Sequence, residues 1–169
     1  MKTESSENFT NREAHMPCCV MVVDHRGVRY FRYWLGTMTK LGEKGFNLNA
    51  RQWKKKTIGH IAHPAVRMTR GAARDAFRRR VDAHYDRFWK SAVHEARRIA
   101  EQEELATTFL VGSDRLVLPL KAMFPKRAQG RVALIEQDLG KLSAAALSRR
   151  LAGQISQWTA AKLQEKLAS

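Results

Sequence analysis

Short apolar runs divided by turn residues characterise the first third of the chain. Residues 18–23 form one such run, and residues 28–34 form another. The tetrapeptide Asp24-His25-Arg26-Gly27 stands between them, with residue types that favour tight turns. The pattern predicts a β-hairpin in which Gly27 takes the positive φ that such a turn requires.

The segment after this hairpin has a weaker pattern. Residues 36–52 contain Gly and Asn and predict a loop or a weak strand. Residues 53–61 predict a third strand, and Pro64 ends whatever precedes it.

A long amphipathic helix is the most regular feature of the chain. Apolar side chains recur at steps of three and four between residues 72 and 102, directly after the small-residue loop Arg70-Gly71-Ala72-Ala73. The predicted buried stripe consists of Phe77, Val81, Tyr85, Phe88, Ala92, Ala96 and Ile99. Charged side chains are expected on the other faces, namely Arg74, Arg78, Asp82, Asp86, Lys90 and Arg97.

Strands and helices alternate in the remaining part of the chain. Residues 107–111 predict a buried strand, and Ser113 or Asp114 is the expected N-cap of a helix over residues 115–124. Pro125 ends that helix.

The last two predicted elements follow the same logic. Residues 131–135 predict another core strand. Ser143 is expected to cap a final helix that runs to Leu167. Its apolar side consists of Leu147, Leu151, Ile155, Trp158 and Leu163.

Together these elements predict a single domain of the α/β class. The order β-β-β-α-β-α-β-α favours a mixed β-sheet with helices on its faces. Residues 1–16 are polar and without periodicity, so we expect a flexible tail there and the domain over residues 17–169.

Positive charge narrows the classes of partner. The chain has a net charge of +15, and residues 51–100 contribute +10 of it, from 14 Lys/Arg and four Asp/Glu. Clustered positive charge favours polyanions, because binding releases their counterions. The alternative is a basic surface that only keeps the protein soluble.

A basic loop followed by a helix is the candidate phosphate-binding site. Arginines around a helix N-terminus with free amide groups form an anion site, and a lysine triplet adds a second contact. The alternatives are that Gly71 only begins a helix and that the lysines form a solvated face. The expected RNA- or phosphate-binding residues are Lys54, Lys55, Lys56, Arg67, Arg70, Gly71, Arg74, Arg78 and Arg79.

Cysteine usage and hydropathy indicate a reducing compartment. Cys18 and Cys19 are adjacent, so on a strand they point to opposite faces and do not bridge each other. The N-terminus has no apolar signal region, and no run approaches the ~20 residues of a membrane span. We therefore expect a cytoplasmic protein.

Metal and nuclease chemistry find little support in the sequence. His60 and His63 are three residues apart, but a third ligand is missing nearby. The aspartates are scattered rather than clustered as a two-metal nuclease needs. We expect no metal site and no cofactor.

Four aromatic residues could stack on bases, namely Tyr30, Tyr33, Trp34 and Trp53. Tyr30 and its neighbour Phe31 must face opposite sides of a strand, so at least one of these two is a core residue.

Three segments carry a resemblance to a known family. Residues 22–31 look like its opening hairpin, residues 109–121 look like its strand-turn-helix unit, and residues 70–80 fall where it has a catalytic loop and the start of a long helix. With the order of elements, they resemble the middle domain of archaeal and eukaryotic peptide-chain release factors, Pelota and bacterial relatives described as translational machinery proteins. The resemblance covers residues 17–163 and implies an RNase H-like, ribosomal protein L18-like topology.

The chain departs from this family at the catalytic loop. Release factors carry Gly-Gly-Gln there, and the glutamine helps water to attack the peptidyl-tRNA ester. Aligned through Phe77, this chain has Arg70-Gly71-Ala72, and its nearest glutamines are Gln52 and Gln102. An alanine methyl group cannot stabilise a developing oxyanion, and the protonated Arg74 is no general base. The resemblance therefore implies the fold without the hydrolysis.

These observations favour a translation-associated, non-catalytic protein that binds the ribosome or a structured RNA (rRNA or tRNA). No catalytic residue, small-molecule cofactor or membrane partner is expected. One alternative is a peptidyl-tRNA hydrolase or ribosome-rescue factor with an altered loop. Another is an interaction module for an acidic protein partner. The sequence leaves the oligomeric state open.

Overall fold

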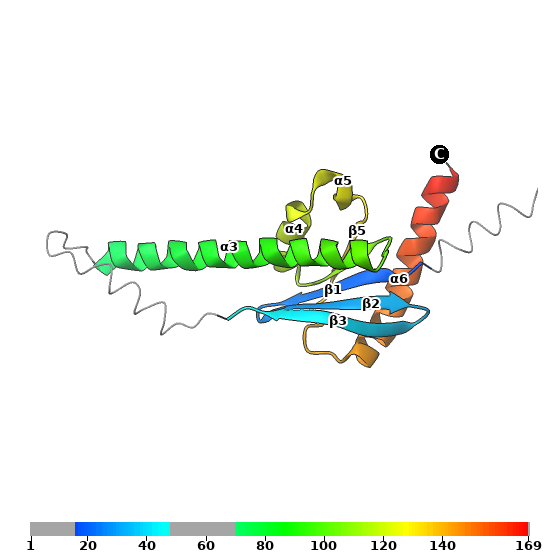
Figure 1. The fold of residues 1–169 in the computed structure, drawn as a ribbon, viewed down its shortest axis with the longest axis horizontal. Coiled ribbons are helices and arrows are strands. Elements are labelled where there is room, and N and C mark those ends of the chain that lie inside the picture. Colours follow the sequence, from blue (N-terminus) through cyan, green and yellow to red (C-terminus); the bar gives the residue numbers. More distant parts are fainter. Residues whose placement is uncertain (1–15, 48–69, 169) are drawn as a thin grey trace, which may run out of the picture.

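A five-stranded mixed sheet forms the centre of the computed structural model, which describes residues 16–47 and 70–168 (Figure 1). The strands are β1 (Cys18–Asp24), β2 (Gly27–Trp34), β3 (Thr37–Gly45), β4 (Thr108–Gly112) and β5 (Val132–Glu136). The helices are α3 (Arg70–Gln102), α4 (Asp114–Met123), α5 (Lys126–Gln129) and α6 (Ala144–Leu167).

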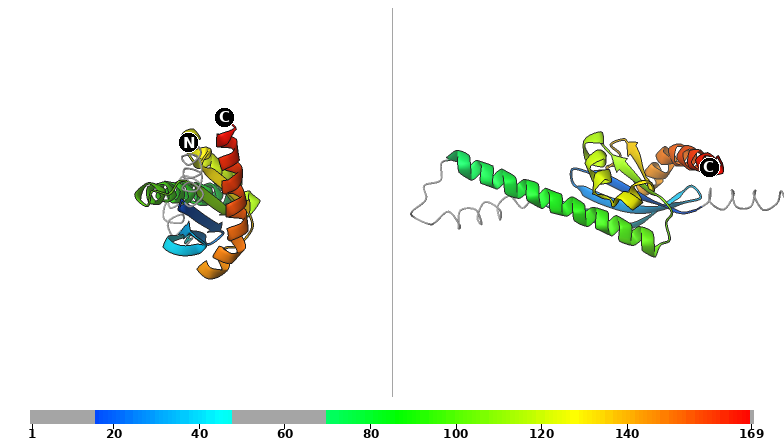
Figure 2. Two further views of the ribbon diagram at one scale, coloured as in Figure 1. Left: turned by 90° about the vertical axis from the view of Figure 1, so that its right-hand side faces the viewer. Right: turned by 90° about the horizontal axis from the view of Figure 1, so that it is seen from above.

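The strands lie in the order β3-β2-β1-β4-β5. β2 runs antiparallel to both β1 and β3, whereas β1, β4 and β5 are parallel to one another. α3 and α6 lie on opposite sides of the sheet (Figure 2). The predicted α/β class, with a mixed sheet and helices on its faces, is confirmed.

Two elements were predicted only as an alternative or not at all. The third strand of the described residues is β3 (Thr37–Gly45), within the segment expected to be a loop or a weak strand. The strand predicted over residues 53–61 lies outside the described residues. The structure also has the short helix α5, which was not predicted. Pro125, the residue that ends α4, is the N-cap residue of α5.

The β1–β2 turn has the predicted geometry. Asp24 Oδ1 accepts hydrogen bonds from the backbone amides of Arg26, at 2.7 Å, and Gly27, at 3.1 Å. Gly27 has a φ of 149°, and a Cβ at this position would collide with the carbonyl oxygen of Lys44 on β3. Glycine is therefore required both by the turn and by the neighbouring strand.

β1 separates two hydrophobic cores. Cys19, Met21 and Val23 pack in the core beneath α3 and α4, whereas Cys18, Val20 and Val22 pack in the core beneath α6. The two cysteines are free and face opposite sides, as the sequence predicted. The α6 side also buries Leu147, Leu151 and Ile155, and Ser143 caps α6 by accepting a hydrogen bond from the Ala146 amide. No helix within residues 16–47 and 70–168 is long and apolar enough to cross a membrane.

Arg29 fastens the segment between β5 and α6 to the sheet. Its guanidinium donates hydrogen bonds to the carbonyl oxygens of Leu142, at 2.8 Å, and Gly140, at 2.6 Å. Gly140 packs so closely on the Asp24 carboxylate that a Cβ would overlap it. A planar guanidinium can hold several carbonyl groups at once because its donors point in fixed directions.

We expect Arg29→Ala to lower the free energy of unfolding by about 1–3 kcal/mol, because carbonyl groups in a partly buried loop lose a charged donor. Urea denaturation measures this change. The matched control is Arg26→Ala, which removes an exposed arginine from the adjacent turn and should change stability by less than about 0.5 kcal/mol. Equal effects for the two variants would contradict the fastening role.

The cysteines should be unreactive in the folded protein. Burial raises the pKa of the Cys18 thiol to about 11 and that of the Cys19 thiol to about 12. Iodoacetamide at pH 8 should therefore label neither thiol in buffer and both in guanidinium chloride, as mass spectrometry will show. Since the unfolded thiols ionise near 9.0, the free energy of unfolding should also fall as the pH rises from about 9 towards 11. Rapid labelling of the native protein would show that β1 is not protected as described.

Candidate nucleic-acid interface

α3 is longer than the sheet it covers. Its 33 residues span about 50 Å at about 1.5 Å per residue, whereas the nine residues of β3 span about 30 Å. The N-terminal part of the helix extends past the sheet (Figure 1). The rest of α3, residues 84–102, packs on the body of the domain, by which we mean the sheet and the elements packed on it. There the ring centres of His84 and Tyr85 lie 5.5 Å and 4.8 Å from that of Phe46. We call residues 70–83 the overhang.

The overhang holds five of the nine predicted site residues. Arg70 and Gly71 belong to the first turn of α3, so the prediction of a loop over Arg70-Gly71-Ala72-Ala73 is wrong. The helix starts two residues before its apolar pattern begins, because the alanines that follow Gly71 have a high helix propensity. Arg74, Arg78 and Arg79 are exposed further along the overhang. The other four candidates, Lys54, Lys55, Lys56 and Arg67, lie outside the described residues.

The face of α3 that covers the sheet becomes basic in the overhang. Residues 18 positions apart lie on the same face of a helix, because 18 residues make five turns. Arg74 therefore lies in line with Ala92, and Arg78 lies in line with Ala96, yet both alanines are fully buried. The prediction that these arginines occupy faces away from the buried stripe is wrong.

The apolar stripe is also only partly buried at this end. Phe88, Ala92, Ala96 and Ile99 are core residues, as predicted. Phe77 and Val81 are half-buried and belong to neither hydrophobic core of the described residues. The change occurs where the sheet ends, so position along α3 decides whether this face packs on protein.

Three of the four Lys and Arg side chains in residues 84–102 of α3 are paired, whereas the described arginines of the overhang are not. Residues 84–102 have three ion pairs: Lys90–Asp86 at 2.7 Å, Arg97–Glu101 at 3.8 Å and Arg98–Glu95 at 2.5 Å. The hydrogen bond from Arg98 lowers the pKa of Glu95. The following arginines make no ion pair with any residue of the described chain: Arg74, Arg78, Arg79, Arg80 and Arg87.

This distribution leaves Arg74, Arg78, Arg79 and Arg80 without an ion-pair partner among the described residues. Residues 70–83 contain five arginines and two aspartates, for a net charge of +3, whereas residues 84–102 have a net charge of +1. Guanidinium groups that are exposed and unpaired can donate to phosphate oxygens without first breaking a contact within the protein.

The aromatic residues that could stack on bases differ in how exposed they are. Tyr30 is 1% exposed, and its hydroxyl donates a hydrogen bond to the Ala92 carbonyl at 3.0 Å, so it is a core residue, in agreement with the expectation that at least one of Tyr30 and Phe31 is core. Tyr33 is half-buried. Trp34 is 45% exposed, with the Arg32 guanidinium 5.3 Å from its ring centre. Trp53 lies outside the described residues.

Histidines do not gather into a site within the described chain. His84 lies against Phe46, and His94 is exposed on α3. In residues 16–47 and 70–168, no three His, Cys, Asp or Glu side chains form a group that could hold a metal ion. His60 and His63 lie outside these ranges.

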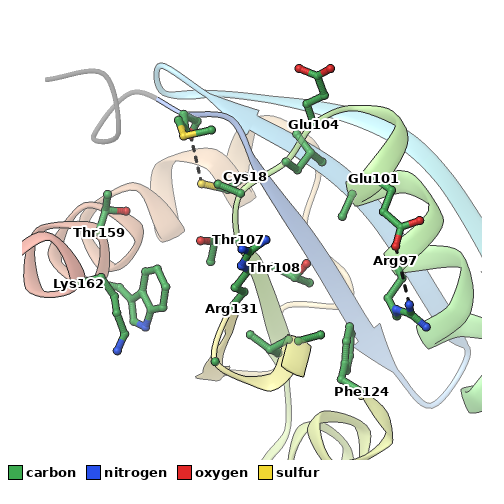
Figure 3. Close-up of a pocket in the computed structure, with 18 of the residues that line it drawn as sticks. Cys18, Arg97, Glu101, Glu104, Thr107, Thr108, Phe124, Arg131, Thr159 and Lys162 are labelled. Atoms are coloured by element: carbon green, nitrogen blue, oxygen red, sulfur yellow. Dashed lines mark hydrogen bonds and ion pairs between the residues drawn. The ribbon is translucent and has the colours of Figure 1, made fainter. Parts of the chain in front are cut away.

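A second basic surface was not predicted from the sequence. An open groove of about 940 Å³ lies at the end of the sheet where β4 and β5 begin. Lys162 and Thr159 from α6 line one side, Arg97 and Glu101 from α3 line the other, and Arg131 lies between them (Figure 3). We call this the basic groove. Its cations come from separate parts of the chain, namely α3 (Arg97), α5 and the turn after it (Arg127 and Arg131) and α6 (Lys162).

The fold is similar to that of a solved archaeal protein. Pelota from Archaeoglobus fulgidus matches with a TM-score of 0.50 at 7% sequence identity, over 99% of this chain and 43% of that chain. The archaeal translation termination factor aRF1 matches with a TM-score of 0.46 at 11% identity, over 89% of this chain and 42% of that one. The chain thus spans less than half the length of either protein. A search of curated protein sequences finds no match.

The fold defines the class of the protein as a release-factor- and Pelota-like α/β domain. Residues 10–162 match the model of "Bacterial archaeo-eukaryotic release factor family 10", and the chain belongs to this family. The match covers nearly the whole chain, so the resemblance proposed from the sequence is confirmed.

Proposed function

We propose that this protein is a translation-associated, non-catalytic RNA-binding protein that contacts the ribosome or a structured RNA through the α3 overhang. Its family supports a translation-related role. The observation that carries the RNA-binding part is the group of unpaired arginines on a helix end that extends past the sheet.

The geometry of the overhang favours contact with phosphates rather than with base edges. Arg74 and Arg78 point from one face of the helix, and Arg79 lies about 100° further round, so cationic groups surround the helix end. Such an end can enter a concave surface lined by phosphates and meet charge on more than one side. Phosphate contacts fix position without reading sequence, and structured RNA is recognised mainly by shape.

The chemistry of the overhang supports binding without ester hydrolysis. The position that matches the release-factor glutamine is Ala72, which lies within α3 and has no polar side-chain atom. A hydrolase needs a group that orients water or stabilises the oxyanion, and arginine side chains do not act as bases.

Replacement of Arg70, Arg74 and Arg78 together by alanine should weaken RNA and ribosome association. The logarithm of the binding constant should also depend less on the logarithm of the salt concentration, by about one unit per lost phosphate contact. Co-sedimentation with ribosomes over a salt series measures both effects.

The matched control is Arg115→Ala, Lys141→Ala and Arg149→Ala, which removes the same charge from exposed positions of the body. The overhang variant should unfold at the same temperature as the parent, because Arg74 and Arg78 make no ion pair within the described chain. If the two triple variants sediment alike, the net charge of the whole protein determines ribosome association, and the overhang is not the binding site.

A release assay separates binding from catalysis. Stalled ribosomes that carry labelled peptidyl-tRNA should retain the peptide in the presence of this protein, because no side chain at the Ala72 position can assist the attack of water. Puromycin provides the positive control for release. Peptide release at a rate that the overhang variant abolishes would instead establish a peptidyl-tRNA hydrolase or rescue factor with an altered site.

A further inference from the structure

Trp158 lies between two adjoining grooves on the far side of the molecule from the overhang. It lines the basic groove, and it also lines a smaller groove of about 450 Å³ between β5 and α6. The smaller groove contains three glutamines, Gln137, Gln154 and Gln157, and we call it the glutamine groove. The indole of Trp158 is half-buried, and its ring centre lies 5.3 Å from that of Phe109.

The basic groove has cations that are available to a ligand. Arg127 and Arg131 are exposed and make no ion pair within the described residues. Lys162 Nζ lies 6.0 Å from the Trp158 ring centre and 2.5 Å from Glu165, in an ion pair that is exposed on both sides. Exposed pairs contribute little to stability, so this lysine can turn to an anion at low cost.

Carboxylates in the same groove lie on its other side. Glu101 is held by Arg97 at 3.8 Å, and Glu104 is exposed at the end of α3. Lys162 lies on the α6 side of the groove, Arg131 lies between the two sides, and Arg127 also lines the groove. The side next to Trp158 therefore carries the Lys162 ammonium group.

The glutamine groove contains an unsatisfied acceptor. The side-chain carbonyl oxygen of Gln154 is buried and accepts no hydrogen bond from the described residues. A buried acceptor without a donor costs about 1–3 kcal/mol, and such groups call for a partner. Gln154, Trp158 and Lys162 recur every four residues of α6, so an amide, an aromatic ring and an ammonium group follow one another along a single face.

We infer that this face of α6 binds a nucleotide of single-stranded RNA. The base stacks on Trp158, the Gln154 side chain turns towards the groove so that its oxygen accepts a hydrogen bond from the base edge, and the phosphate is held by Arg127, Arg131 and Lys162. A ring beside cations is the arrangement with which proteins hold single strands, because every base has a π-face. This inference rests on the proposed RNA-binding function and adds a second site at the other end of α3.

The test uses a fluorescein-labelled oligouridylate of eight nucleotides and measures its anisotropy with the whole chain over a salt series. Arg127→Ala with Arg131→Ala should weaken binding about tenfold and reduce the salt dependence by about 1.4, as expected for two phosphate contacts on a single strand. The matched control is Arg115→Ala with Arg149→Ala, which removes two exposed arginines elsewhere. A control that weakens binding as much as the groove variant would overturn the site.

A second measurement does not depend on the folding of a variant. Oligouridylate that contains 4-thiouridine, irradiated on the parent protein, should cross-link to the α6 peptide that contains Trp158. Trp158→Leu, which keeps an apolar contact with Phe109, should lower affinity about tenfold through the loss of stacking.

The two proposals can fail separately. The cross-link at Trp158 should persist in the Arg70, Arg74 and Arg78 triple variant, whatever happens to ribosome binding. Cross-links confined to α3, with normal binding by the groove variant, would overturn the groove site alone and leave an acidic protein segment as the candidate occupant.

Discussion

The burial of β1 on both faces is the constraint on which the rest of the structure depends. Residues from Cys18 to Val23 are all buried, so neither face of this strand can be left to solvent. Its neighbours must therefore lie in a sheet, and helices must cover both sides. α3 and α4 cover one face, and α6 covers the other. The same burial accounts for the raised pKa of the two thiols.

A second constraint is the difference in length between α3 and the sheet. A helix of about 50 Å cannot be covered by strands of about 30 Å, so one end must extend past them. The residues on the sheet-facing side change accordingly, from Ala92 and Ala96 over the strands to Arg74 and Arg78 beyond them. Arginines at these two positions cannot be explained by packing on the sheet, because the sheet is not there.

Much of this fold could be predicted from local pattern. The β1–β2 hairpin, α4 and the Ser143 cap of α6 follow from turn residues and apolar spacing, which act over a few positions. β3 was harder, because Met38 is the only buried residue of this edge strand and the apolar alternation is correspondingly weak. α5 is only four residues long and has no apolar pattern of its own.

The site could be predicted only in part. The basic run of α3 is plain in the sequence, but the apolar stripe continues through Phe77 and Val81, so periodicity alone does not show where the sheet ends. The basic groove was missed for a different reason. Arg127 and Arg131 lie four residues apart in α5 and the turn after it, but Lys162 lies on α6, and only the packing of α6 on the sheet brings it to the same groove.

The distribution of charge along α3 bears on how one nucleic acid would meet this protein. Arg97 lines the basic groove, and Arg74 lies 23 residues away in the overhang, a separation of about 35 Å along a continuous helix. Between them, Lys90 is already paired with Asp86, so a phosphate at this point of the helix would compete with an existing contact. Contacts at the two ends suit a partner that presents phosphates to the overhang and a flexible strand to the groove, and the rigid helix sets the distance between them.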